Sequence, residues 1–93
     1  MTNNTSDTIF IGKKPIMTYV TSAIIQLSAL PSITIKARGL SIGLAVDVTQ
    51  VILRKTTAFK VGNIKISSES LESSDGKKRN VSTIEIPVSR IAQ

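Results

Sequence analysis

The chain contains no cysteine and no histidine. Without thiols or imidazoles it can form no disulfide, no zinc site of the Cys/His type and no imidazole acid–base pair. The six carboxylates are scattered along the chain, and no glycine-rich loop of the P-loop kind is present. The sequence therefore predicts a protein that is not an enzyme and that carries no cofactor or metal.

Aromatic residues are scarce, since Phe10, Tyr19 and Phe59 are the only ones. Aromatic side chains on a sheet stack unpaired bases in common RNA-recognition modules, so we expect no recognition of that kind. Long apolar runs are missing as well, and none approaches the ~20 residues of a membrane-spanning helix. The polar N-terminus does not resemble a signal peptide, so we expect a cytoplasmic protein without a membrane partner.

What the chain does have is a globular composition with an excess of positive charge. Hydrophobic residues make up 41% and charged residues 19%, as in a folded domain. We expect a flexible tail over residues 1–7 and a single domain over residues 8–93. Twelve Lys and Arg residues oppose six Asp and Glu residues, and the resulting net charge of +6 favours polyanionic partners.

Hydrophobic periodicity predicts an α+β domain with the element order β-α-β-α-β-β. A right-handed crossover would make the first two strands parallel and place both helices on one face of a four-stranded mixed sheet. Ser41 is the predicted N-cap of the second helix. The predicted elements are strand 8–12, helix 15–30, strand 32–37, a helix from 42 to 56–59, strand 61–70 and strand 81–88.

The last two strands carry further local signals. Alternation predicts that Ile64 and Ile66 lie on one face of the third strand. It also predicts that Ile84, Ile86 and Val88 face inward from the last strand. Pro87 cannot donate a ladder hydrogen bond, which predicts an edge position or a bulge in the last strand. The dipeptide Asp75-Gly76 predicts the turn of a hairpin whose end projects by ~15 Å beyond the packed body.

The stretch from Ile11 to Ile16 leads from the first strand into the first helix. Pro15 suits a first helical position, because its φ is preset there and its missing N–H is not needed. Lys13 and Lys14 would then lie at the positive end of the helix dipole, where each cation costs roughly 0.3–1 kcal/mol. A phosphate at this position would reverse the sign, so the lysine pair predicts an anion site.

Two further basic clusters accompany the lysine pair. Lys36 and Arg38 lie at the end of the second strand, which parallel pairing brings beside the end of the first. Lys77, Lys78 and Arg79 follow the predicted hairpin turn. Each cluster alone is compatible with ordinary solvated charge. The presence of all three clusters favours binding to phosphates. Lys13, Lys14, Lys36 and Arg38 would form a basic rim at the strand ends, and Arg79 would enter a minor groove.

With these motifs placed, the chain resembles Alba, a family of archaeal chromatin proteins, over about residues 8–90. The resemblance implies a fold like the C-terminal domain of a bacterial translation initiation factor. It also implies a homodimer that binds double-stranded DNA and RNA with little sequence preference, as a chromosome-associated protein that compacts DNA. It rests on four motifs: Ile11-Gly-Lys-Lys-Pro-Ile-Met17, Ile35-Lys-Ala-Arg-Gly39, Ala45-Val-Asp47 and Val81-Ser-Thr-Ile-Glu-Ile86.

The resemblance also implies residue roles. The family's lysine pair contacts nucleic acid and matches Lys13 and Lys14, of which Lys13 matches the acetylated residue. Acetylation would remove one charge and weaken binding. The family's remaining basic contacts match the strand cluster (Lys36 and Arg38) and the hairpin cluster (Lys77, Lys78 and Arg79).

The chain departs from the family pattern at three positions. Leu40 and Leu44 stand where basic residues are common, which predicts either a weaker contact from the body or an apolar contact instead. Thr56 stands where an aromatic residue often packs dimers side by side, so cooperativity between dimers is left open. Two other functions are also left open: an RNA-directed role, as a chaperone or ribonucleoprotein subunit, and a protein-interaction module with incidental basicity.

Overall fold

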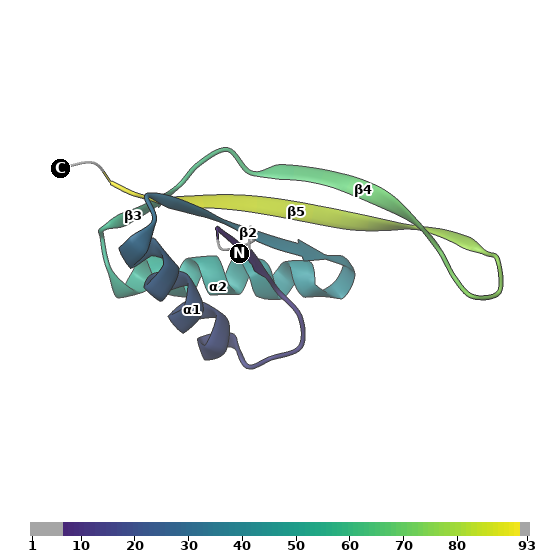
Figure 1. Ribbon diagram of the computed structural model, residues 1–93, viewed down its shortest axis with the longest axis horizontal. Coiled ribbons are helices and arrows are strands. Elements are labelled where there is room, and N and C mark those ends of the chain that lie inside the picture. The colour runs from purple at the N-terminus through teal and green to yellow at the C-terminus, as the bar shows by residue number, and fades with distance from the viewer. Residues whose placement is uncertain (1–6, 92–93) are drawn as a thin grey trace.

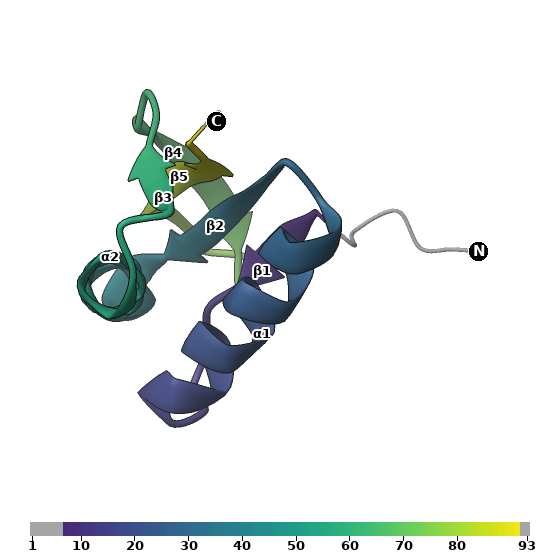
Figure 2. The same cartoon turned by 90° about the vertical axis from the view of Figure 1, so that its left-hand side faces the viewer.

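The computed structural model describes residues 7–91, in which two helices pack on one face of a five-stranded mixed sheet (Figures 1 and 2). The α+β class and the order of the elements are those predicted from the sequence. The third predicted strand is interrupted, and this interruption raises the number of strands from four to five. The elements are β1 (Thr8–Phe10), α1 (Ile16–Ala29), β2 (Ser32–Arg38), the 3₁₀ turn η1 (Gly39–Ser41), α2 (Ile42–Lys55), β3 (Phe59–Val61), β4 (Lys65–Glu72) and β5 (Lys78–Arg90).

The core lies between the two helices and the sheet. β2 alternates as predicted, since Ile33, Ile35 and Ala37 are buried while Lys36 between them is only half-buried. β5 contributes the next row across the sheet, and the helices cover both rows with small and branched side chains at helical spacing. The buried helix and β5 residues are Tyr19, Val20, Ala23 and Leu27 of α1, Ala45, Val48, Thr49 and Ile52 of α2, and Ile84, Ile86 and Val88 of β5.

The sheet has the order β1-β2-β5-β3, with β4 pairing on the same edge of β5 as β3. β1 and β2 are parallel, as predicted, with Phe10 opposite Lys36. β2 and β5 are antiparallel, with Ile35 opposite Ile86. The carboxyl ends of β1 and β2 therefore lie side by side, which is the arrangement that the basic rim requires.

The predicted strand over residues 61–70 is broken between β3 and β4, and Pro87 explains the break. The sequence predicts an edge position or a bulge for Pro87. It does not lie at an edge, because β5 is paired on both sides. Its carbonyl accepts a hydrogen bond from Gly62 N–H at 2.9 Å, but its nitrogen has no hydrogen to return. A Cβ on Gly62 would also come within 3.3 Å of the Pro87 ring. The neighbouring strand leaves the ladder where the central strand lacks a donor.

Ile84, Ile86 and Val88 of β5 are buried as predicted, whereas Ile64 and Ile66 are exposed. Ile66 pairs with Ile84, a core residue of β5, so both point to the face of the sheet that carries the helices. Ile64 and Ile66 nevertheless remain 53% and 79% exposed, because no helix covers this edge of the sheet. No other part of the described chain, residues 7–91, buries these two side chains.

Both helix entrances differ in detail from the prediction. Pro15 is the N-cap of α1 rather than its first helical residue, and its carbonyl accepts a hydrogen bond from Thr18 N–H at 3.0 Å. Ser41 occupies the N-cap position of α2 but makes no side-chain capping bond, because the 3₁₀ turn η1 already leads the chain into the helix.

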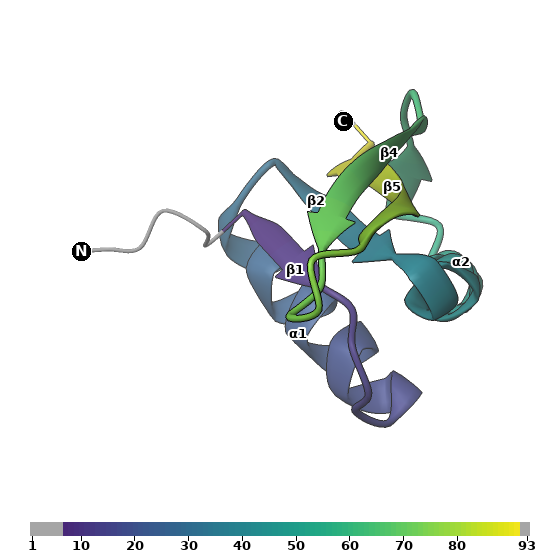
Figure 3. The same cartoon turned by 90° about the vertical axis from the view of Figure 1, so that its right-hand side faces the viewer.

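The β4–β5 hairpin forms an arm that projects from the body (Figure 1), and Figure 3 views this arm from its turn. Residues 78–82 of β5 extend past Thr83, the last residue that pairs with β2. The turn falls at Asp75-Gly76 as predicted, and Gly76 adopts φ 84°, a conformation that suits glycine. The longest dimension of the molecule, 51 Å, reflects this arm.

Most of the predicted tail lies outside the described residues. Of residues 1–7 only Asp7 is described, and its carbonyl accepts a hydrogen bond from Thr34 N–H at 2.8 Å. Between residues 7 and 91, neither helix is long and apolar enough to cross a membrane.

Candidate nucleic-acid interface

The loop of residues 11–15 between β1 and α1, which carries Lys13 and Lys14 and is called the lysine loop below, is held in place by a buried tyrosine. The Tyr19 hydroxyl accepts hydrogen bonds from Gly12 N–H at 2.8 Å and from Lys14 N–H at 2.9 Å. Tyr19 itself is 6% exposed in the first turns of α1. On the other side, Ile11 N–H donates to the Lys36 carbonyl at 2.9 Å and extends the β1–β2 ladder into the loop. The loop is thus tied to a helix and to a strand.

The charges on this loop have no counter-ion in the described part of the chain. Lys13 and Lys14 are exposed, and neither forms an ion pair with a residue in 7–91. The first turn of α1 contains no acidic residue, and no side chain of the described residues caps its N–H groups. Two ammonium groups and an uncapped helix start therefore share one end of α1, an arrangement that is unfavourable alone and favourable around an anion.

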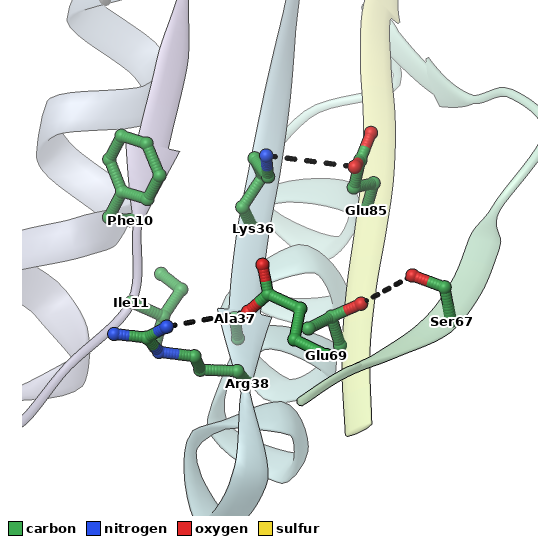
Figure 4. Close-up of a pocket in the computed structure, with 9 residues that line it drawn as sticks. Phe10, Ile11, Lys36, Ala37, Arg38, Ser67, Glu69 and Glu85 are labelled. Carbon is green, nitrogen blue, oxygen red and sulfur yellow. Dashed lines mark hydrogen bonds and ion pairs between the residues drawn. The ribbon is translucent and has the colours of Figure 1, made fainter. Parts of the chain in front are cut away.

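Lys36 and Arg38 project from β2 onto the face of the sheet that no helix covers (Figure 4). Lys36 Nζ lies 3.6 Å from a Glu85 carboxylate oxygen, and Arg38 Nη1 lies 3.3 Å from a Glu69 carboxylate oxygen. All four side chains are 40% or more exposed, so water screens both pairs. These two cations are positioned at the predicted rim, but each already has a carboxylate beside it.

The third cluster lies at the end of the arm. Lys77 belongs to the turn, and Lys78 and Arg79 begin β5 opposite Glu72 and Leu71. All three basic side chains are exposed. The structure therefore brings the first two clusters to neighbouring strand ends and leaves the third apart on the hairpin.

Hydrogen bonds inside the turn hold the shape of the hairpin end. Ser73 N–H donates to the Lys77 carbonyl at 2.8 Å, and Gly76 N–H donates to the Ser73 carbonyl at 2.9 Å. The Asp75 carboxylate accepts from the Ser73 hydroxyl and from Lys77 N–H. These hydrogen bonds stabilise the ionised carboxylate and hold the pKa of Asp75 below its ordinary value. The bond from the Ser73 hydroxyl has the largest effect.

Two aromatic residues of this region have a larger part than the sequence indicates. One turn into the first helix, Tyr19 is within reach of the lysine pair, although the sequence favours partly buried packing; the structure shows burial and hydrogen bonds to the loop together. Phe10 was counted among the scarce aromatics without a surface role. Its position between the buried Ile9 and Ile11 is the available signal, because alternation turns the residue between two core residues outward.

Side chains suited to metal binding do not gather in residues 7–91, where no group of three or more His, Cys, Asp or Glu could hold an ion. What the described surface offers instead is a basic loop at a helix entrance, an ion-paired strand cluster and a basic arm. A two-layer α+β domain with these three basic features is typical of a protein that binds polyanions.

The family model described as Alba matches residues 7–68, so the chain belongs to the Alba family. It is 65% identical over 92 residues to the DNA/RNA-binding protein Alba of Nitrosopumilus maritimus, covering 97% of each chain. It is 44% identical over 84 residues to the protein of the same name from Methanocella arvoryzae, covering 88% of each. The protein of that name from Nanoarchaeum equitans is also 44% identical, over 82 residues, with 84% of this chain and 91% of the relative covered.

Solved structures agree with this assignment. Alba from Thermoplasma volcanium superimposes with a TM-score of 0.82 at 41% identity, covering 89% of this chain and 99% of that one. ALBA1 from Trypanosoma brucei superimposes with a TM-score of 0.76 at 21% identity, covering 95% of this chain and 72% of that one, and shows the shared fold.

Proposed function

We propose that this protein binds double-stranded DNA and RNA through their phosphates, with little sequence preference and without catalysis. The observation that carries the proposal is the exposed Lys13–Lys14 pair at the uncapped entrance of α1. No described carboxylate neutralises it, and the N–H groups of the helix start lie uncapped at the same end of α1, an arrangement that favours phosphate. Its relatives' printed names, DNA/RNA-binding protein Alba, support the same conclusion.

The hairpin arm extends the proposed interface. Lys77, Lys78 and Arg79 lie at its end, clear of the core, where a ribbon can follow the groove of a duplex. We propose that the guanidinium of Arg79 enters the minor groove, where arginine side chains often bind because of its negative potential. Lys36 and Arg38 would add phosphate contacts from the body by exchanging their carboxylates for phosphate oxygens.

Compaction of a chromosome requires more than one contact surface, and we propose that the protein acts as a homodimer. Ile66 lies exposed on the helix-bearing face of the sheet, and Ile64, just before β4, is exposed as well. A second copy would bury them and place two lysine loops and two arms on one particle. In sedimentation equilibrium we expect twice the mass of the chain, and a monomer for Ile66→Glu. A monomeric native protein would contradict this part.

Regulation by acetylation and a chromosome-associated, cytoplasmic location complete the proposal. The Lys13 side chain is exposed, and its ammonium has no counter-ion among the described residues. Acetylation would remove that charge beside the helix dipole and weaken phosphate binding.

The proposal is tested by binding isotherms on duplex DNA and duplex RNA over a series of salt concentrations. Each phosphate contact contributes about −0.9 to the log–log slope on duplex DNA. The variant Lys13→Glu/Lys14→Glu should bind on the order of 100-fold more weakly and with a shallower slope. The matched control is Lys60→Glu/Arg90→Glu, which changes the net charge equally in exposed residues of β3 and the end of β5. Equal losses in both variants would show that affinity depends only on the net charge of the protein, which would contradict the proposal.

A further inference from the structure

The open face of the sheet carries a pocket whose chemistry differs from that of the lysine loop. Its volume is about 390 Å³, within the range of about 300–1,000 Å³ that small-ligand sites occupy. Four strands contribute to it: β1 supplies an aromatic ring, β2 supplies two cations, and β4 and β5 supply carboxylates and hydroxyls. Figure 4 shows these side chains together: Phe10, Lys36, Arg38, Ser67, Glu69 and Glu85.

Phe10 is the aromatic wall of this pocket. Its ring is 61% exposed, although it lies between Ile9 and Ile11, which are 6% and 7% exposed. A single exposed apolar residue is common on protein surfaces and by itself indicates nothing. Here, however, Lys36 Nζ lies 5.8 Å from the ring centroid, and the ring borders a pocket lined with polar groups. The ring therefore presents its π face beside a cation.

The polar groups of the pocket supply both hydrogen-bond donors and acceptors. Lys36 and Arg38 can donate to phosphate or base oxygens, and the Glu69 and Glu85 carboxylates can accept from base N–H groups. The hydroxyls of Ser67 and Thr83, 2.7 Å apart, can do either. A purely phosphate-binding surface would have no use for two carboxylates, because they repel the ligand.

A nucleobase combines the features that this pocket complements, namely a flat π face and an edge with both donors and acceptors. In a duplex the faces are stacked and the Watson–Crick edges are paired, so only an unpaired base can present both. We propose that the Phe10 pocket binds an unpaired nucleobase of a single-stranded segment by stacking on the Phe10 ring. Lys36 turns from the ring toward the adjacent phosphate when the base enters. This inference rests on the proposed function and adds a single-strand subsite to it. It departs from the expectation, drawn from the scarcity of aromatic residues, that no base stacks on the sheet, because β1 exposes the Phe10 ring.

The test compares Phe10→Leu with Phe10→Tyr in the full chain. Leucine keeps apolar bulk at the position but has no π face, whereas tyrosine keeps the ring. Affinities are measured by fluorescence anisotropy on a short uridine-rich single-stranded RNA, on the same sequence as single-stranded DNA, and on duplex DNA. Stacking on an aromatic side chain accounts for about 5- to 150-fold in affinity per base.

The expected result for Phe10→Leu is a fall of about fivefold or more in the ratio of single-strand to duplex affinity, with Phe10→Tyr close to the native ratio. A loss on both single-stranded probes assigns the contact to the base, and a loss on RNA alone assigns it to a ribonucleotide. An unchanged ratio for Phe10→Leu overturns the inference. Thermal midpoints of both variants close to that of the native protein confirm that the fold is intact.

A second readout locates the base directly. RNA that carries 5-iodouracil crosslinks to aromatic side chains on irradiation, and this chain has only Phe10, Tyr19 and Phe59 to offer. Tyr19 is buried, so we expect the crosslinked peptide to contain Phe10. A crosslink at Phe59 alone, or none, overturns the inference even if duplex binding is intact. Absence of duplex binding in the native protein would instead contradict the proposed function, so the two failures are distinguishable.

Discussion

The lysine loop and the strand cluster carry the same charge but stand in different electrostatic situations. Lys13 and Lys14 have no described counter-ion and are held at a helix entrance by the Tyr19 hydroxyl. Lys36 and Arg38 lie 3.6 and 3.3 Å from carboxylate oxygens on β5 and β4. A phosphate gains the full attraction at the loop but must displace a carboxylate at the strand. The comparison teaches that the number of cations on a surface does not measure the anion affinity of that surface.

The largest effect is expected when each pair is removed in turn. Lys13→Ala/Lys14→Ala should weaken duplex binding by about 30-fold, because two uncompensated phosphate contacts are lost. Lys36→Ala/Arg38→Ala should cost about fivefold, since the exchange of carboxylate for phosphate gains less. Isotherms at one moderate salt concentration measure both. Equal losses would contradict the idea that neighbouring carboxylates weaken the phosphate contacts of Lys36 and Arg38.

The next effect concerns the support of the loop. Tyr19→Phe removes the acceptor of two backbone N–H groups and should lower the free energy of unfolding by about 1 kcal/mol. The midpoint of thermal unfolding should fall by about 4–8 °C. Duplex affinity should drop severalfold while the salt slope remains, because both lysines are still present.

The salt slope and the stability together make the Tyr19 experiment decisive. An unchanged melting midpoint and affinity would show that the hydroxyl has no part in placing the loop. A slope that falls as in the lysine variants would show that the loop has lost its phosphate contacts altogether.

A smaller effect of opposite sign is expected when a carboxylate is removed from the strand cluster. Glu69→Gln frees Arg38 and should raise duplex affinity by about two- to fivefold, with little change in stability because the pair is exposed. Glu72→Gln is the matched control, since it alters the net charge equally on the same arm. Glu72 forms no ion pair with residues 7–91. A gain of the same size in the control would assign the effect to net charge.

The smallest effect is a pH dependence at the hairpin end. The depressed pKa of Asp75 means that its hydrogen bonds support the turn above the ordinary carboxyl pKa. This support is lost as the pH falls through the lowered value in the folded protein. Ser73→Ala removes the first cause, so the Asp75 pKa should rise toward its ordinary value in an NMR titration. An unchanged titration would contradict the hydrogen bond from Ser73.

Much of the fold was predictable because it depends on local pattern. Alternation in β2, helical spacing in α1 and the turn at Asp75-Gly76 each involve residues close in sequence. The break between β3 and β4 was not predictable in this way, because it depends on Pro87, which lies more than twenty residues further along the chain. The exposure of Ile66 was not predictable for a related reason. Periodicity shows on which face of a strand a residue lies, but not which other element covers that face.

The order of the residues alone shows where the cations lie along the chain, and that two of them lie between Gly12 and Pro15, directly before a helix. Tertiary structure decided which of those cations are free, because the register of β2 against β5 and of β5 against β4 sets which carboxylates reach them. It also decided that Tyr19 supports the lysine loop and that Phe10 faces solvent beside Lys36. Charge and periodicity belong to the residues in order, whereas counter-ions, support and exposure depend on neighbours that only folding brings together.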